Sequence, residues 1–161
     1  NGTKINQSFL IFTGGIESSK IKGLENFDTN QRGQVKVNKF LQTNENKNIF
    51  AVGDIAEVKT PEGELMPPNV TIARITGTVA GKNILNLIDK RGLHECKPKL
   101  EGILIALGGK YAAGNLYGLL NVKGRIAYEI KSYVFSSYRK PLLKLIKKGY
   151  NRLKKIKENG N

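Results

Sequence analysis

The sequence has little of the residue types that carry covalent or metal chemistry. Its 161 residues include one cysteine, one histidine, one methionine and no tryptophan. The single cysteine, Cys96, excludes an internal disulfide and any Cys-x-x-Cys redox or zinc motif. His94 has no partner motif either, so we interpret both residues as ordinary members of a linker over 94–100. The sequence therefore predicts no metal ligand.

Long apolar runs and acidic residues are scarce as well. No apolar run approaches the ~20 residues that a membrane-spanning helix needs. The chain has 27 Lys and Arg against 13 Asp and Glu, a net charge of +14. Residues 123–161 hold twelve basic and two acidic residues, so +10 of this charge lies in that segment. Such a segment favours an anionic partner, either lipid or nucleic acid, and an ordinary solvated helix face is the third interpretation.

The stretch Asn48–Ile55, which reads Asn-Ile-Phe-Ala-Val-Gly-Asp-Ile, organises the predicted fold. Ile49–Val52 is a continuous apolar run, which is typical of a strand buried on both faces of a parallel sheet. Gly53 and Asp54 then end the strand, at the sheet edge where open α/β proteins bind ligands. Glycine admits close backbone approach, and aspartate accepts hydrogen bonds from sugar hydroxyls. An ordinary Gly-Asp turn is the alternative.

Upstream and downstream segments extend this α/β pattern. Phe9–Thr13 and Val35–Val37 are predicted as short strands. Asn69 is a good N-cap, and apolar residues at helical spacing predict a helix from about Asn69 to Lys90. We expect a glycine, Gly92, just after its last turn.

Two glycines, Gly77 and Gly81, interrupt this helical pattern. Because glycine destabilises a helix interior by about 1 kcal/mol, we expect close packing at both positions to compensate.

The carboxyl-terminal part has a different pattern. Gly102–Leu107 predicts another strand, and Tyr111–Val122 predicts an antiparallel hairpin or meander. Lys123–Ile156 is predicted to be largely helical, with a break at Pro141, because proline lacks the amide hydrogen of a helix interior.

Several motifs follow one another in an order that resembles a known class. The amino-terminal set is Phe9–Gly15, Arg32–Val37, Phe40–Thr43 and Ile49–Asp54. That order resembles the two-dinucleotide-binding-domain flavoproteins of the pyridine nucleotide–disulfide oxidoreductase class. A second set narrows the resemblance to type II NADH dehydrogenases: Pro67–Asn69, Gly102–Ala113 and Gly124–Tyr128.

The resemblance implies a fold and a truncation. Such proteins carry two GxGxxG phosphate-binding fingerprints, neither of which occurs here, and this sequence begins with Asn1 rather than Met. We therefore expect a piece of a longer protein, with an α/β fold and three parts. The first part is an incomplete Rossmann-like FAD-binding segment over 1–93. The other two are a small β element over 94–122 and a basic amphipathic helical tail over 123–161. Together these two form a small α+β carboxyl-terminal domain. We expect the isolated piece to be inactive and to self-associate through the exposed sheet edge at Ile49–Val52.

The resemblance also implies cofactors and site residues. FAD is the expected cofactor, and NADH is the expected substrate, held by the missing half. Asp54, with Gly53 beside it, would hydrogen-bond the ribityl chain of FAD, and the backbone at Val70, Thr71 and Ile72 would approach the flavin ring. A helix N-terminus favours the negative charge that a reduced flavin develops. No side chain of this chain is expected to be catalytic, because the cofactor carries the chemistry.

Two departures from the family pattern bear on the electron acceptor. Thr71 and Ile75 stand where the family has glutamines that line the quinone pocket, so a quinone or another acceptor is left open. Tyr128 stands where a tryptophan is common, and tyrosine also anchors at a lipid interface.

The basic tail implies docking on an anionic membrane surface. We expect a peripheral position on the cytoplasmic face of a membrane, or a cytoplasmic location. The alternative function is a nucleic-acid-binding module that uses the tail. Because residues 123–161 contain no zinc-finger, RNP-like or zipper pattern, we expect no nucleic-acid partner.

Overall fold

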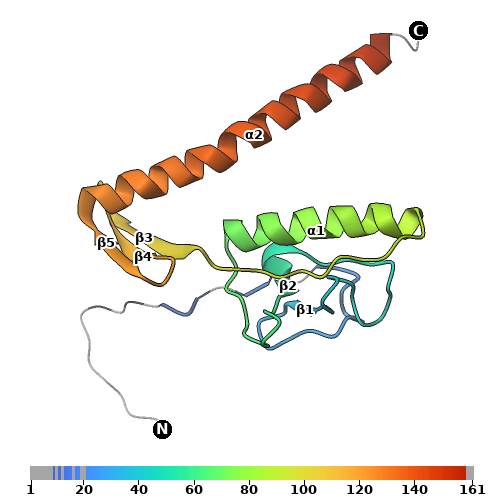
Figure 1. Cartoon of the computed structure of the whole chain (residues 1–161), viewed down its shortest axis with the longest axis horizontal. Coiled ribbons are helices and arrows are strands. Elements are labelled where there is room, and N and C mark those ends of the chain that lie inside the picture. The colour runs from blue at the N-terminus through green and yellow to red at the C-terminus, as the bar shows by residue number, and fades with distance from the viewer. Residues whose placement is uncertain (1–8, 10, 12, 16, 19–20, 159–161) are drawn as a thin grey trace. The chain divides into compact units, whose positions relative to one another are not determined.

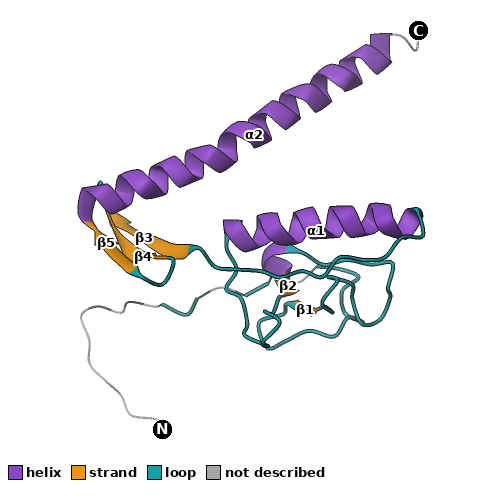
Figure 2. Ribbon diagram, in the orientation of Figure 1, coloured by secondary structure: helices purple, strands orange, loops and turns teal. Residues whose placement is uncertain are grey.

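The computed structural model describes residues 9, 11, 13–15, 17, 18 and 21–158, with side chains as far as Arg152. The chain divides into two compact units, Asn1–Lys99 and Leu100–Asn161 (Figure 1). Short strands, a 3-10 turn and one long helix form the first unit, whereas a three-stranded sheet and a second long helix form the other (Figure 2).

The first unit contains a small parallel sheet. Strand β1 (Val35–Lys36) pairs in parallel with strand β2 (Ala56–Glu57), and Val35 lies opposite Ala56. The 3-10 turn η1 (Gly53–Ile55) directly precedes β2. This pairing confirms the short strand predicted near Val35–Val37 and gives the unit its α/β character.

The strand predicted at Ile49–Val52 is wrong as a regular strand. Only an isolated antiparallel bridge joins Phe50 to Gln42, and the run is not buried on both faces, since Ile49 is 40% exposed. The pairing stays short because Leu41 has φ 70°, which interrupts the extended partner segment.

The strand predicted at Phe9–Thr13 falls partly on residues outside the described part of the chain. Its described members Phe9, Ile11 and Thr13 belong to no strand or helix, and Phe9 and Ile11 are exposed to 86% and 84%. These two residues do not have the buried setting that the prediction required.

Helix α1 (Val70–Ile88) begins where the sequence predicts. Asn69 is its N-cap, and the Asn69 side chain accepts a hydrogen bond from the Ile72 amide at 2.9 Å. The predicted C-terminal glycine is wrong, because Lys90 adopts the left-handed conformation with φ 55°. The Arg91 and Lys90 amides donate to carbonyls of the last helical turn, so a Schellman motif closes α1 without glycine.

The two glycines inside α1 do not pack closely. A Cβ atom built on Gly77 or Gly81 would meet no heavy atom within 4 Å, so the expected compensation by packing is wrong. Both positions lie on the exposed face of the helix.

The hydrophobic core of the first unit lies between α1 and the small sheet. Its buried members are Val35, Leu41, Ala51, Ala56, Val58, Ile72, Ala80 and Cys96. Asn83 of α1 adds a buried polar clamp, because its side chain bonds the His94 amide and carbonyl at 2.8 and 2.9 Å. This clamp fixes the linker against the helix, so Cys96 lies in the core.

The second unit is a meander with one helix. Strands β3 (Gly102–Gly108), β4 (Tyr111–Leu116) and β5 (Leu120–Lys123) form an antiparallel sheet in that order, as predicted. Helix α2 (Gly124–Glu158) packs its first turns on this sheet. Ala112 of β4 and Ala127 of α2 are completely buried at this contact, since small side chains allow close approach of helix and sheet.

The break predicted at Pro141 is wrong. Helix α2 runs continuously for 35 residues with Pro141 inside it. Proline removes one amide donor, and on an exposed helix water can satisfy the carbonyl that this donor would have bonded. Within the described residues, neither helix is both long enough and apolar enough to cross a bilayer.

Candidate functional site

The turn η1 places Asp54 between β2 and α1. Val52, before the turn, is extended, and Gly53 then takes φ 67°, in the left-handed region that favours glycine. The position of a Cβ on Gly53 is 3.5 Å from Ala73 Cβ, an ordinary contact distance. The backbone conformation rather than lack of space therefore requires glycine at the first position of the turn.

Two buried side chains hold the backbone of the turn from opposite sides. Gln34 Nε2 donates to the Asp54 carbonyl at 3.0 Å and lies 3.4 Å from the Ala56 carbonyl. The Thr76 hydroxyl of α1 accepts a hydrogen bond from the Gly53 amide at 3.0 Å. The turn is thus tied both to the strand region and to the helix.

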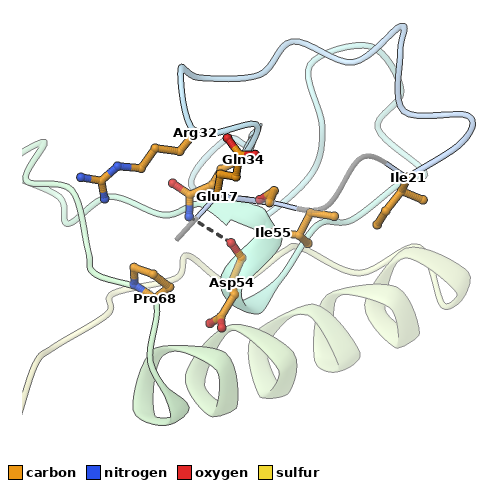
Figure 3. Close-up of a pocket in the computed structure, with 8 residues that line it drawn as sticks. Glu17, Ile21, Arg32, Gln34, Asp54, Ile55 and Pro68 are labelled. Atoms are coloured by element: carbon orange, nitrogen blue, oxygen red, sulfur yellow. Dashed lines mark hydrogen bonds between the residues drawn. The ribbon is translucent and has the colours of Figure 1, made fainter. Parts of the chain in front are cut away.

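A cavity of about 290 Å³ opens beside this turn. Its lining combines carboxylate, guanidinium, amide and hydroxyl groups with three apolar side chains: Glu17, Ser18, Ile21, Arg32, Gln34, Asp54, Ile55 and Pro68. Figure 3 shows the Asp54 carboxylate pointing away from Gln34, and the Arg32 guanidinium pointing away from that carboxylate. Acceptors and a cation on separate parts of one cavity suit a ligand that carries both hydroxyls and negative charge.

The beginning of α1 adjoins this cavity through Pro68. The first turn of a helix offers amide hydrogens and the positive end of the helix dipole. The Ile72 amide is already bonded to the Asn69 side chain, and the Ile72 side chain is buried. Val70, in contrast, is 57% exposed.

Asp54 is the one predicted site residue that lines the cavity. Gly53 precedes it in the turn, while Val70, Thr71 and Ile72 lie in the first turn of α1, close in sequence to the lining residue Pro68. The structure therefore brings the turn and the helix N-terminus into one region. Contact of these five residues with a cofactor stays a prediction.

The sequence analysis did not identify Gln34 and Thr76 as residues that hold the turn at Gly53 and Asp54. Thr76 carried a usable signal, since it is a polar residue on the helix face that also holds Ile72 and Ala80, and it is completely buried. A polar side chain on a buried face normally has a specific hydrogen-bond partner. Gln34 carried no comparable signal, because its partners Asp54 and Ala56 are distant in sequence.

Two titratable groups near the core have shifted pKa values. The hydrogen bond from Lys59 lowers the pKa of Glu57 on β2, and the Asn30 side chain acts in the same direction, against the effect of burial. Burial raises the pKa of the Cys96 thiol, which keeps it in the neutral form. Over the described residues, no group of three or more His, Cys, Asp or Glu side chains could hold a metal ion.

The sequence of this chain is similar to one protein family and to several known proteins. Residues 1–80 match the model of the family described as pyridine nucleotide-disulphide oxidoreductase. The chain is 29% identical over 133 residues to a type II NADH:quinone oxidoreductase of Haemophilus influenzae. It is 34% identical over 137 residues to apoptosis-inducing factor homolog A of Dictyostelium discoideum, and 27% identical over 119 residues to human ferroptosis suppressor protein 1.

These matches cover most of this chain but a minor part of each relative. They include 79%, 82% and 73% of the chain, respectively. The chain spans about 30% of the length of the curated relatives that it matches.

Proposed function

We propose that this chain is the FAD-holding and membrane-docking portion of a flavin-dependent NADH dehydrogenase. The proposal starts from residues 1–80, which are a pyridine nucleotide-disulphide oxidoreductase segment. The chain also has distant homology to type II NADH:quinone oxidoreductases. The single observation that carries the FAD part is the Asp54 carboxylate. Asp54 is an exposed residue that lines a polar cavity, on a turn whose backbone is held by Gln34 and Thr76.

The residues present fit a flavin dinucleotide. Asp54 offers carboxylate oxygens, which accept hydrogen bonds from the hydroxyls of a sugar-alcohol chain. Gly53, at φ 67°, leaves the backbone free of a side chain beside that carboxylate. The N-terminal turn of α1, with Val70 and Thr71, presents the positive end of a helix dipole next to the cavity.

Each group has a defined task in this proposal. Asp54 binds and orients the ribityl hydroxyls, and the backbone at Gly53 allows close approach. Val70, Thr71 and Ile72 place the positive end of α1 near the ring system, where it stabilises negative charge. When bound, FAD supplies the hydride and electron chemistry.

The reaction of the complete protein is the oxidation of NADH. In this proposal NADH binds to a part that this chain does not supply, so the chain alone has no NADH dehydrogenase activity. Quinone is the acceptor suggested by the relatives that are named NADH:quinone oxidoreductases. Thr71 and Ile75 leave open whether this protein uses a quinone or another acceptor.

A flavin titration tests the FAD part. We expect Asp54→Ala, made in the complete coding sequence of the protein, to weaken FAD binding by roughly ten- to a hundred-fold, since a charge-assisted hydrogen bond contributes about 1.5–3 kcal/mol. Asp89→Ala is the matched control, because Asp89 caps the far end of α1. Equal affinities for the two variants would contradict the assignment of Asp54.

The membrane part of the proposal rests on α2. Its exposed apolar residues are interleaved with the cations of residues 123–161: Ile126, Val134, Phe135, Leu142, Leu143, Leu145 and Ile146. Leu142, Leu145 and Ile146 share a helix face by their spacing of three and four. Apolar insertion together with attraction to anionic lipid is the expected binding mode, on the cytoplasmic face of a membrane.

A comparison of two anionic surfaces tests this part. The purified chain is mixed with anionic liposomes and with duplex DNA across a salt series. We expect retained liposome binding at high salt, because apolar insertion is not screened. Binding to DNA alone, with a steep salt dependence, would support the nucleic-acid-binding alternative instead.

A further inference from the structure

The turn that carries Asp54 has one hydrogen bond of its own, from the Ala56 amide to the Gly53 carbonyl. Val52, at its N-cap, provides no side-chain hydrogen bond, and Gly53 is in a conformation that glycine leaves readily in a free chain. Two side chains from outside the turn add to this bond and hold the backbone at Gly53 and Asp54.

Thr76 supplies one of these groups from α1. Its hydroxyl proton is directed to the Ile72 carbonyl at 2.8 Å or the Ala73 carbonyl at 3.1 Å. A lone pair of the same oxygen then accepts from the Gly53 amide at 3.0 Å. Thr76 is completely buried, so water cannot replace the hydroxyl without rearrangement of the helix contact.

Gln34 supplies the other group from the residue preceding β1. Its amide nitrogen donates to the Asp54 carbonyl at 3.0 Å, and its amide oxygen accepts from Asn30 Nδ2 at 3.0 Å. Gln34 is 5% exposed, and the Asn30 contact fixes the orientation of its amide. Gln34 thus holds the Asp54 main chain, and the Asp54 carboxylate lies on the side away from Gln34 (Figure 3).

We infer that Gln34 and Thr76 are positioning residues, which direct the Asp54 carboxylate toward the sugar-alcohol hydroxyls of a flavin. This inference rests on the proposed function. A carboxylate held in its binding direction before the ligand arrives loses less conformational entropy on binding. The two side chains act through the turn and touch neither cofactor nor substrate.

The chain contains a matched control for each residue. Thr43 is a buried threonine whose hydroxyl bonds the Asn46 backbone instead of the turn. Gln42 is 5% exposed like Gln34, and its amide bonds Asn38 and the Lys47 carbonyl in a local arrangement that resembles Asn30–Gln34. Thr43→Val and Gln42→Met therefore remove the same chemical groups from equally buried sites.

The first measurement is FAD affinity, by titration of flavin fluorescence. We expect Thr76→Val and Gln34→Met each to weaken binding roughly ten-fold relative to Thr43→Val and Gln42→Met. Thr76→Ser, which keeps the hydroxyl, should restore most of the affinity. Equal losses in the site variants and their controls, at matched free energies of unfolding, would overturn the inference.

The second measurement needs no cofactor. Hydrogen exchange of the Gly53 amide in the ligand-free chain should be about ten-fold faster in Thr76→Val and unchanged in Thr43→Val. Unchanged Gly53 exchange in Thr76→Val would overturn the inference whatever the FAD result. Failure of the unmodified protein to bind FAD, with the exchange difference present, would overturn the proposed function and leave the positioning of the turn standing.

Discussion

At the scale of single residues, Asp54 combines a buried backbone contact with an exposed side chain. Its carbonyl oxygen accepts a hydrogen bond from the buried Gln34 amide at 3.0 Å, and the residue lines a polar cavity. A backbone held by buried groups is rigid, and an exposed carboxylate remains available to a ligand. Two residues distant in sequence, Gln34 and Thr76, thus bond the backbone of the Gly-Asp turn.

Glu57 permits a prediction about pH, two residues after the turn. Its carboxylate is 2.8 Å from the Lys59 ammonium, and its side chain is 10% exposed. Because the pKa of Glu57 is lowered from its ordinary value of 4.5, the charged carboxylate stabilises the fold above that pH. This stabilisation is lost as the pH falls through the lowered value.

We expect Glu57→Gln to reduce the free energy of unfolding near neutral pH by about 0.5–1 kcal/mol. The difference from the unmodified chain should disappear as the pH falls below 4.5. Urea unfolding at a series of pH values measures both effects. A constant difference from pH 7 down to pH 3 would contradict the role of the ionised carboxylate, and Glu62→Gln on the exposed loop serves as the control.

At the scale of elements, β4 depends on the absence of a side chain at one position. A Cβ atom on Gly114 would lie 1.8 Å from the Ile103 carbonyl oxygen of β3, far below any contact distance. Gly114 also pairs with Leu104 on one side and with Val122 of β5 on the other, so it lies at the centre of the sheet. The sheet has no room for a larger residue there without a shift of the backbone.

We expect Gly114→Ala to destabilise the second unit by at least about 2 kcal/mol. Gly149→Ala is the control, because a Cβ at that position in α2 meets nothing within 4 Å and alanine favours helix. Thermal unfolding followed by circular dichroism measures both. Equal melting temperatures for the two variants would contradict the steric argument.

At the scale of the whole molecule, charge and apolar surface are unevenly distributed. Residues 123–161 hold twelve basic residues, and the exposed apolar side chains of α2 lie among them. Near an anionic lipid surface each basic residue contributes about 1 kcal/mol, in addition to the burial of apolar side chains. This combination is the basis on which we propose lipid binding for α2, and the deletion below tests it.

We expect deletion of residues 140–161 to abolish sedimentation with anionic vesicles and to leave the rest folded. Helix α2 packs on the sheet through its first turns, around Ala127, so the deleted part is not needed for that contact. Circular dichroism checks the remaining fold. If the shortened chain still sediments with the vesicles, the docking role of this tail is wrong.

Self-association is the second expectation at this scale. The edge first expected for it, Ile49–Val52, is not a regular strand, so we now consider the edge strand β3. Within the described residues, β3 pairs only with β4 and presents exposed apolar side chains at Ile103, Ile105 and Leu107. An unpaired, apolar edge strand invites pairing with another chain. Light scattering at high concentration should show oligomers, and Ile105→Lys should reduce them while Ile126→Lys on α2 does not. A clean monomer would contradict this expectation.

The sequence by itself determined the elements whose causes are local. The side chain of Asn69 caps α1 because the cap bond spans only three residues, and the strands β3, β4 and β5 form because tight turns join them. The ordered motifs also identified the family segment, and the Gly-Asp turn marked the candidate site. Each of these features depends on neighbours in the chain.

Only the tertiary structure decided the features that depend on distant residues. Ile49–Val52 is not a regular strand because the left-handed Leu41 interrupts its partner, and α2 continues through Pro141 because the helix there is exposed. The turn at Gly53–Ile55 is held by Gln34 and Thr76, which are 42 positions apart in the sequence. No local pattern reveals such a pairing, because hydrogen bonds between buried groups form only after the strands and the helix have packed together.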